Sequence, residues 1–308
     1  MAEDKRLESI VEVLLDYTLL QFDKQIELSD KGDQIDAIAA GINTIGEELK
    51  HALEEERKTK KQLEEYSKRL ETRNRELEEF IYITSHDLQE PLQSVKSFSE
   101  IIQSEYAEKL PKESSYMFHQ IDQSTFRMSR QIHGLLEYLR IGEKKEVGRV
   151  NVLQAVQEAI EKNTPLIENR KARVHIGTLP EINGHSEEIT ILFDKLINNA
   201  LIFTEKEKHP EIHISGEETE NGWIFKVKDN GIGIEETHFK RIFRIFQRLH
   251  SRSEYSGIGM GLSICQKIAE LHKGDIYVDS KLGEGSTFTL FLSKDLPELN
   301  TNLQSLTG

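Results

Sequence analysis

The chain has little cysteine and no long apolar run, which argues against a disulfide within the chain and against a membrane span. Cys265 is the only cysteine among 308 residues, so an intrachain disulfide is impossible and a reducing compartment is expected. No stretch approaches the ~18 consecutive apolar residues that a membrane span needs, and the start MAEDKRLE is too polar for a signal peptide. We therefore expect a cytoplasmic protein with no membrane span in this chain.

Positive charge is also in deficit. The formal net charge is −14, which disfavours broad electrostatic attraction to nucleic acid or anionic lipid, so no nucleic-acid partner is expected. ATP remains a feasible ligand, because nucleotide sites act through local glycine backbone, magnesium and a few cations. The length allows about two domains plus connecting helices.

Proline is absent from residues 7–80, which are rich in Glu, Lys and Leu and predict long helices rather than a compact core. Apolar residues then recur at the core spacing of a coiled coil: Leu63, Tyr66, Leu70, Leu77 and Phe80. This pattern favours a dimeric coiled-coil linker over residues 51–79. Arg73 interrupts the seam, so a single solvated helix is the alternative.

Residues 33–49, from Asp-Gln-Ile to Gly-Glu-Glu-Leu, resemble the second helix of a HAMP signal-relay module. Such a module normally follows a membrane span, and no span is expected before this one. The alternative is another amphipathic pairing helix. We assign residues 1–50 to a HAMP-like or amphipathic helical relay segment.

Two amphipathic helices are expected over residues 80–145. The first carries an apolar stripe past Pro91, where a kink or a loosened helix is predicted. The second follows a break at Leu110 and Pro111, with apolar residues at helical spacing from Met117 to Leu139. The pair forms a helical hairpin, and two hairpins would form a four-helix bundle in a dimer.

Beyond residue 150 the pattern becomes mixed. Trp223, Phe225 and Val227 alternate with polar neighbours, which is the period of a strand. Residues 276–278 and 287–292 predict a hairpin across two glycines. We expect an α+β protein: the helical hairpin, then an α/β sandwich domain over 150–295, then a tail over 296–308.

His86 is the one histidine of eleven that lies in the octapeptide Ser-His-Asp-Leu-Gln-Glu-Pro-Leu. It lies two positions from both Thr84 and Leu88, so on a helix it projects away from the apolar stripe. A neutral imidazole can offer a nitrogen lone pair to phosphorus at neutral pH. Taken alone, the octapeptide is equally compatible with an ordinary surface histidine.

This octapeptide resembles the phospho-acceptor box of the two-component sensor histidine kinases. In that family an acid follows the histidine directly, here Asp87, and proline occupies the fifth position after it, here Pro91. The resemblance implies that Asp87 hydrogen-bonds the other ring nitrogen, which fixes the tautomer and raises basicity. Adjacent helix residues do not normally face one another, so this role needs an accommodating rotamer.

Two glycine clusters flank three phenylalanines further along the chain. They read Asp-Asn-Gly-Ile-Gly-Ile over 229–234 and Gly-Ile-Gly-Met-Gly-Leu over 257–262, and Phe239, Phe243 and Phe246 lie between them. Glycines permit close backbone approach to phosphates, and a helix starting near Gly261 would direct its amides at them. In this order the motifs resemble the Bergerat ATP-binding fold, which histidine kinases share with gyrases and related ATPases.

That resemblance implies roles for individual residues. Asp229 would accept the adenine amino group with support from Thr287, and the loop 246–257 would cover the triphosphate. Arg248 or Arg252 could meet phosphate there, although a solvated basic loop is the alternative. The glycines expected to approach the nucleotide are Gly231, Gly233, Gly257, Gly259 and Gly261.

Asn199 and Ala200 match the end of the family's asparagine box, which makes Asn199 the expected Mg²⁺ ligand. Two departures stand beside it: Lys195 replaces the family's first asparagine, and Ile202 occupies a position that often carries lysine. We count Lys195 among the nucleotide-binding residues, since its ammonium could reach the same triphosphate.

The sequence thus predicts a homodimeric histidine kinase that phosphorylates His86 from ATP and passes the phosphoryl group to a response-regulator receiver domain. Two rivals remain at this point. One is a nucleotide-binding scaffold without efficient phosphotransfer, and the other is an ATP-driven clamp similar to the gyrase relatives. The clamp leaves the His86 box unexplained.

Overall fold

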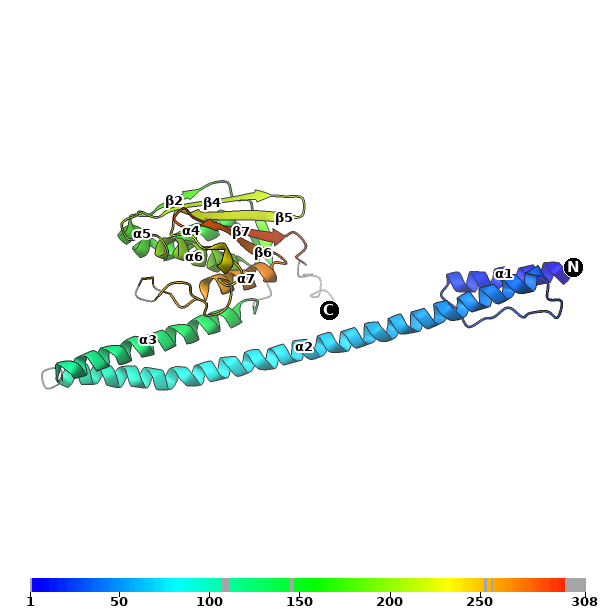
Figure 1. Ribbon diagram of the computed structural model, residues 1–308, viewed down its shortest axis with the longest axis horizontal. Helices are drawn as coiled ribbons and strands as arrows, with labels where there is room; N and C mark the ends of the chain where they lie inside the picture. The colour runs from blue at the N-terminus through cyan, green and yellow to red at the C-terminus, as the bar shows by residue number, and fades with distance from the viewer. Residues whose placement is uncertain (1, 107–110, 144–146, 252–253, 256, 297–308) are drawn as a thin grey trace, which may run out of the picture. The chain divides into compact units, whose positions relative to one another are not determined.

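The computed structural model describes residues 2–106, 111–143, 147–251, 254–255 and 257–296. The chain divides into two compact units, residues 1–80 and 81–308, and each is described by itself. Figure 1 labels the elements. Among the described helices, none combines the length and the apolar character needed to cross a membrane.

The first unit pairs helix α1 (Ala2–Thr18) with the start of helix α2 (Gln34–Tyr106). A small core forms between them and the connecting segment, from Ile10, Val13, Tyr17, Ile26 and Ala39. Asn43 fastens the connection, because its side chain accepts a hydrogen bond from Ile26 N (2.8 Å) and donates one to Ile26 O (2.9 Å). The sequence prediction of long helices missed this connecting segment, although Gly32, with φ of 60°, marks its turn.

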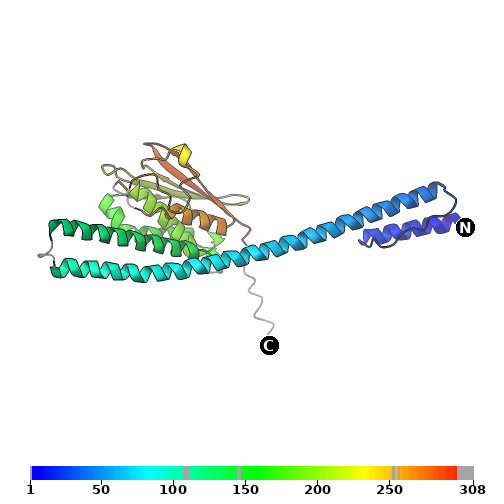
Figure 2. The same cartoon turned by 60° about the horizontal axis from the view of Figure 1, so that its bottom comes forward.

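Helix α2 remains α-helical through Pro91, so the helix accommodates the residue where a kink or loosening was predicted. Helix α3 (Lys112–Arg140) returns beside it, as Figure 2 shows. Asp122 of α3 accepts hydrogen bonds from Ser99 Oγ and Gln103 Nε2 of α2, both at 2.6 Å. The predicted helical hairpin is present, and polar contacts fix part of its inner face.

The rest of the second unit is the predicted layered α/β domain. A five-stranded sheet has the order β2 (Arg173–Ile176), β4 (Glu211–Glu218), β5 (Gly222–Asp229), β7 (Gly285–Ser293) and β6 (Asp275–Lys281). Strands β1 (Gly148–Val150) and β3 (Ile182–Gly184) form a separate pair. The helices are α4 (Val152–Lys162), α5 (Thr164–Arg170), α6 (Ser186–Ile202) and α7 (Gly261–Leu271), and a 3₁₀ turn spans Glu236–His238.

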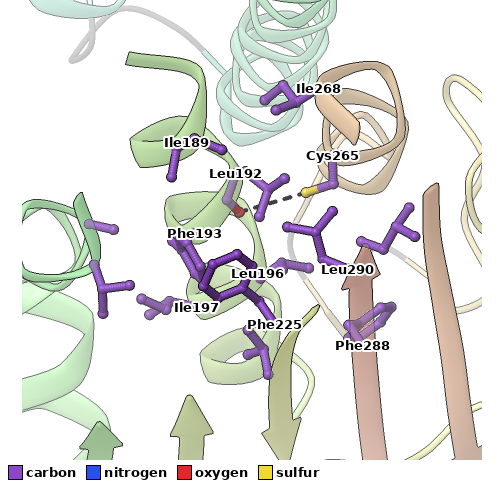
Figure 3. Packing of buried hydrophobic residues seen from close by; sticks show 14 of the residues in the cluster. Ile189, Leu192, Phe193, Leu196, Ile197, Phe225, Cys265, Ile268, Phe288 and Leu290 are labelled. Carbon is purple, nitrogen blue, oxygen red and sulfur yellow. Dashed lines mark hydrogen bonds between the residues drawn. The ribbon is translucent and has the colours of Figure 1, made fainter. Parts of the chain in front are cut away.

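The core of this domain lies between the sheet and helices α4, α6 and α7. Phe193 of α6 meets Phe225 of β5 edge-on, with ring centroids 5.9 Å apart, and Figure 3 shows both rings among the buried aliphatic side chains. Cys265 is fully buried on α7 and donates to Leu192 O. Burial raises the pKa of the Cys265 thiol to about 12, so this cysteine serves as a small core residue.

A buried histidine ties the start of α6 to the end of α7. His272 Nδ1 donates to Ile268 O (2.7 Å), and its Nε2 accepts from His185 N (3.0 Å). Burial lowers the pKa of His272 to about 4, so the ring is neutral near pH 7. Leu296, the first residue of the predicted tail, is also buried, and residues 297–308 lie outside the described part.

Candidate functional site: a histidine cavity and a nucleotide cavity

His86 lies on the exposed surface of the hairpin, with 62% of its side chain accessible. Its Nδ1 is 3.6 Å from Asp87 Oδ1, so a rotamer exists that brings these two adjacent helix residues together. If the ring carries its proton on Nδ1, facing the carboxylate, the lone pair lies on Nε2. His86 lines a cavity of about 520 Å³ between α2 and α3.

A second cavity, which we call the nucleotide cavity, also has a volume of about 520 Å³ and lies against the α/β domain. Its walls contain Lys195, Asn199, Asp229, Gly233, Arg248, Gly257, Gly259 and Gly261. The structure therefore brings together most of the residues that the sequence predicted for ATP. Gly231 and Thr287 are not among the lining residues, and Arg252 lies outside the described part of the chain.

Asp229 ends strand β5 and is buried, with 8% exposed. Its Oδ1 accepts from Gly231 N (2.8 Å) and Ser286 N (3.1 Å), which leaves Oδ2 as the oxygen available to a ligand. Burial raises the pKa of this carboxyl above its usual range, while the two backbone donors oppose the rise. Gly231 has a supporting role here, because its N–H orients the carboxylate.

The strand period decides which residue of β7 supports Asp229. Ser286 and Phe288 line the cavity, while Thr287 between them does not. The alternation of Phe288, Leu290 and Leu292 already contained this information, since residues of even number share the buried face. Ser286, rather than Thr287, is the β7 hydroxyl residue next to Asp229.

The glycines of the two clusters permit close backbone packing. Gly259 has φ of 76°, and a Cβ placed on it would lie 2.6 Å from Gln247 O. Gly233 likewise has a positive φ, 74°, so both positions favour glycine. Helix α7 begins at Gly261 on the cavity wall, and the first amide groups of a helix favour an anion.

Asn199 and Lys195 lie beside that helix start. A Cβ on Gly261 would lie 3.6 Å from both side-chain heteroatoms of Asn199 and 3.8 Å from Lys195 Cβ. Lys195 Nζ is 2.7 Å from Glu137 Oε1 and 3.6 Å from Asp194 Oδ2. Ile202 also lines the cavity, so both departures from the family pattern border the same space.

Arg248 lies in the predicted lid and donates to Tyr255 O at 2.7 Å. This bond links Arg248 to Tyr255, which lies two residues before Gly257 in the sequence. Arg248 also lines the nucleotide cavity.

Sequence reasoning missed the contribution of α3. Ser129, Arg130, His133, Gly134 and Glu137 form one wall of the nucleotide cavity. These five residues lie outside the apolar stripe that the sequence shows, and they meet residues far along the chain, such as Lys195 opposite Glu137 and Ile258 opposite Gly134. No local pattern reports such a pairing.

Comparisons with known families agree with this division of the chain. Residues 76–144 match the family model of the His Kinase A (phospho-acceptor) domain. Residues 184–296 match the histidine kinase-, DNA gyrase B-, and HSP90-like ATPase. Together the two matches cover more than half of the chain.

Similar curated proteins include the phytochrome-like protein Cph1 of Synechocystis sp., which is 37% identical over 74% of this chain and 30% of its own length. Cyanobacterial phytochrome A of Nostoc sp. is 39% identical over 71% of this chain and 29% of its own length. The chain therefore spans about three-tenths of these relatives.

A similar solved structure is that of full-length ShkA in complex with AMPPNP. It has a TM-score of 0.53 at 20% identity and covers 70% of this chain and 46% of its own, which supports the fold. With the two family models in the order phospho-acceptor then ATPase, the chain belongs to the two-component sensor histidine kinases.

Proposed function

We propose that this chain is an ATP-dependent protein histidine kinase that phosphorylates His86 and then donates the phosphoryl group to an aspartate of a response-regulator receiver domain. The observation that carries the proposal is the pairing, in one unit, of an exposed imidazole beside a carboxylate with a cavity that presents Asp229 and the start of α7. The ATP requirement implies a cytoplasmic reaction.

The binding step uses the two ends of the nucleotide cavity. At one end, Asp229 Oδ2 accepts the adenine amino group, since Oδ1 is already engaged by two backbone donors. At the other end, the α7 amides, Lys195 and Arg248 meet the phosphates. Positioning and charge neutralisation supply most of the catalysis in phosphoryl transfer.

Asn199 fits a magnesium ion that arrives with the nucleotide, because it offers a neutral amide oxygen next to the phosphate end. Among the described residues, no group of three or more His, Cys, Asp and Glu side chains could hold a metal alone. The remaining ligands would be phosphate oxygens and water. Magnesium, when bound, neutralises phosphate charge.

The chemical step forms a bond between His86 Nε2 and the γ-phosphorus and breaks the bond from that phosphorus to the bridging oxygen, which leaves with ADP. Asp87 stabilises the positive charge that develops on the ring, and the Nδ1 proton stays on the ring facing this carboxylate. In the second step a receiver carboxylate attacks the same phosphorus, and the imidazole is the leaving group.

A homodimer is part of the proposal. Leu63, Leu70 and Leu77 are 68%, 70% and 55% exposed on α2, and a second α2 would cover them as a coiled-coil seam. Leu88 and Val95 extend this exposed stripe, at 50% and 45%. A second hairpin would bury them in a four-helix bundle.

Incubation of the purified chain with γ-labelled ATP tests the kinase. We expect covalent label that is lost in acid and stable in alkali, as a phosphoramidate requires. Bound nucleotide without label would indicate a scaffold, and release of free phosphate alone would indicate a clamp-type ATPase. Either result would contradict the proposal.

A further inference from the structure

We propose that His86 receives its phosphoryl group from ATP bound to the same chain, so that autophosphorylation is intramolecular in the dimer. This inference rests on the proposed kinase function and specifies its acceptor. The contacts of α3 within the chain support it.

The first step is that α3 borders the phosphate end of the chain's own nucleotide cavity. Lys195 and Asn199 surround the start of α7 at Gly261, which is where the triphosphate is expected. Glu137 of α3 reaches this end, with Oε1 2.7 Å from Lys195 Nζ. Asp229, at the adenine end, makes its hydrogen bonds to Gly231 and Ser286 instead.

The second step is that separate elements of the α/β domain hold this arrangement. Lys267 of α7 donates to Tyr138 O (2.9 Å), and its ammonium lies 4.6 Å from the Tyr138 ring centroid. Gly134 of α3 packs against the segment before α7, where a Cβ would lie 2.5 Å from Ile258 Cδ1. Together with the Lys195–Glu137 pair, these contacts hold the ATP-binding domain against α3 of the same chain.

The third step is that the part of α3 in contact with the ATP-binding domain also lies next to His86. Ser129 and His133 line both the nucleotide cavity and the cavity that contains His86. His133 Nδ1 is 3.1 Å from Ser129 O and 3.4 Å from Gln89 Nε2. Gln89 lies three residues after His86 and so shares its helix face.

Ser129 O only accepts hydrogen bonds and Gln89 Nε2 only donates them, so His133 Nδ1 can pair with one of these two groups at a time. The two α3 residues that line both cavities, Ser129 and His133, are polar. The residues that connect the two cavities thus belong to the chain that carries His86.

Two tagged heterodimers of the full chain test the inference. In the first, His86→Gln in one subunit is paired with Asp229→Asn in the other, after Asp229→Asn has been shown to abolish ATP binding. Intramolecular transfer predicts no label in this heterodimer, because the subunit that binds ATP lacks the acceptor. Label near half that of the wild-type dimer would overturn the inference.

The second heterodimer pairs a wild-type subunit with a His86→Gln/Asp229→Asn subunit. Intramolecular transfer predicts about half of the wild-type label, whereas transfer between subunits predicts none. Each mode of transfer therefore predicts label in one heterodimer and no label in the other. An unlabelled wild-type dimer would instead reject the kinase itself.

If tandem purification recovers no heterodimer, labelling is measured at protein concentrations below the dimer dissociation constant. A labelling rate per chain that persists in the dissociated chain supports intramolecular transfer. A rate that disappears as the dimer dissociates overturns it.

Discussion

The α/β domain and the helical hairpin use apolar residues in opposite ways. In the domain, Phe193, Leu196 and Phe225 are at most 2% exposed, and one chain closes the core. In the hairpin, the inner face contains Ser99 and Asp122, while Leu88 and other apolar residues lie outside. The core of the domain is thus closed within this chain, whereas the hairpin leaves apolar side chains exposed that fit the second copy proposed above.

The largest expected effect comes from breaking the closed core. Phe193→Ala removes a fully buried ring and its edge contact with Phe225, and we expect a loss of about 3–5 kcal/mol in the free energy of unfolding. Tyr277→Ala, at a 58% exposed aromatic residue of β6, is the matched control and should cost far less. Urea unfolding of both variants measures the difference. Equal losses would refute the comparison.

The pH dependence of the domain sharpens the account of its core. His272 is held neutral, with its pKa lowered to about 4, whereas the unfolded chain binds a proton near its ordinary pKa of about 6.5. The unfolded state therefore binds more protons between these values, and stability falls as pH drops from 6.5 to 4. Urea unfolding across this range measures the slope.

His272→Gln should flatten that slope, since glutamine does not titrate. His119→Gln, at an exposed histidine of α3, should leave it unchanged. An unaltered slope in His272→Gln would show that other groups govern the acid sensitivity.

The open surface of α2 should respond to charge. Leu70→Glu places a carboxylate in the proposed seam, and loss of one buried leucine per chain should raise the dimer dissociation constant by at least about tenfold. Lys68→Glu, off the seam, should change it little. Analytical ultracentrifugation measures both. An unchanged constant for Leu70→Glu would favour the single solvated helix.

A smaller effect is expected at Lys195, where the two regions meet. If its ammonium moves from Glu137 to the phosphates when ATP binds, Lys195→Asn should slow phosphorylation by roughly tenfold, as loss of one charge-assisted hydrogen bond predicts. Adding Ile202→Lys should restore the rate, because both positions line the cavity. A faster single variant would show that Lys195 hinders the reaction.

The sequence predicted the parts of the fold that depend on local pattern. The alternation in β5, the β6–β7 hairpin and the α7 start near Gly261 are confirmed. The alternation of buried and exposed residues along β7 could also have identified Ser286 in place of Thr287, because it shows which residues face the cavity. The α3 wall and the Lys195–Glu137 pair could not be predicted, since they depend on packing between distant elements.

The most direct test of the central claim is labelling of His86→Gln with γ-labelled ATP. Because His86 and the nucleotide cavity lie on different elements, the variant should bind ATP as tightly as the wild type yet take no label. His119→Gln, an exposed histidine on α3, should label normally. Acid-stable label that persists in His86→Gln would contradict the assignment of His86 as the phosphoryl acceptor.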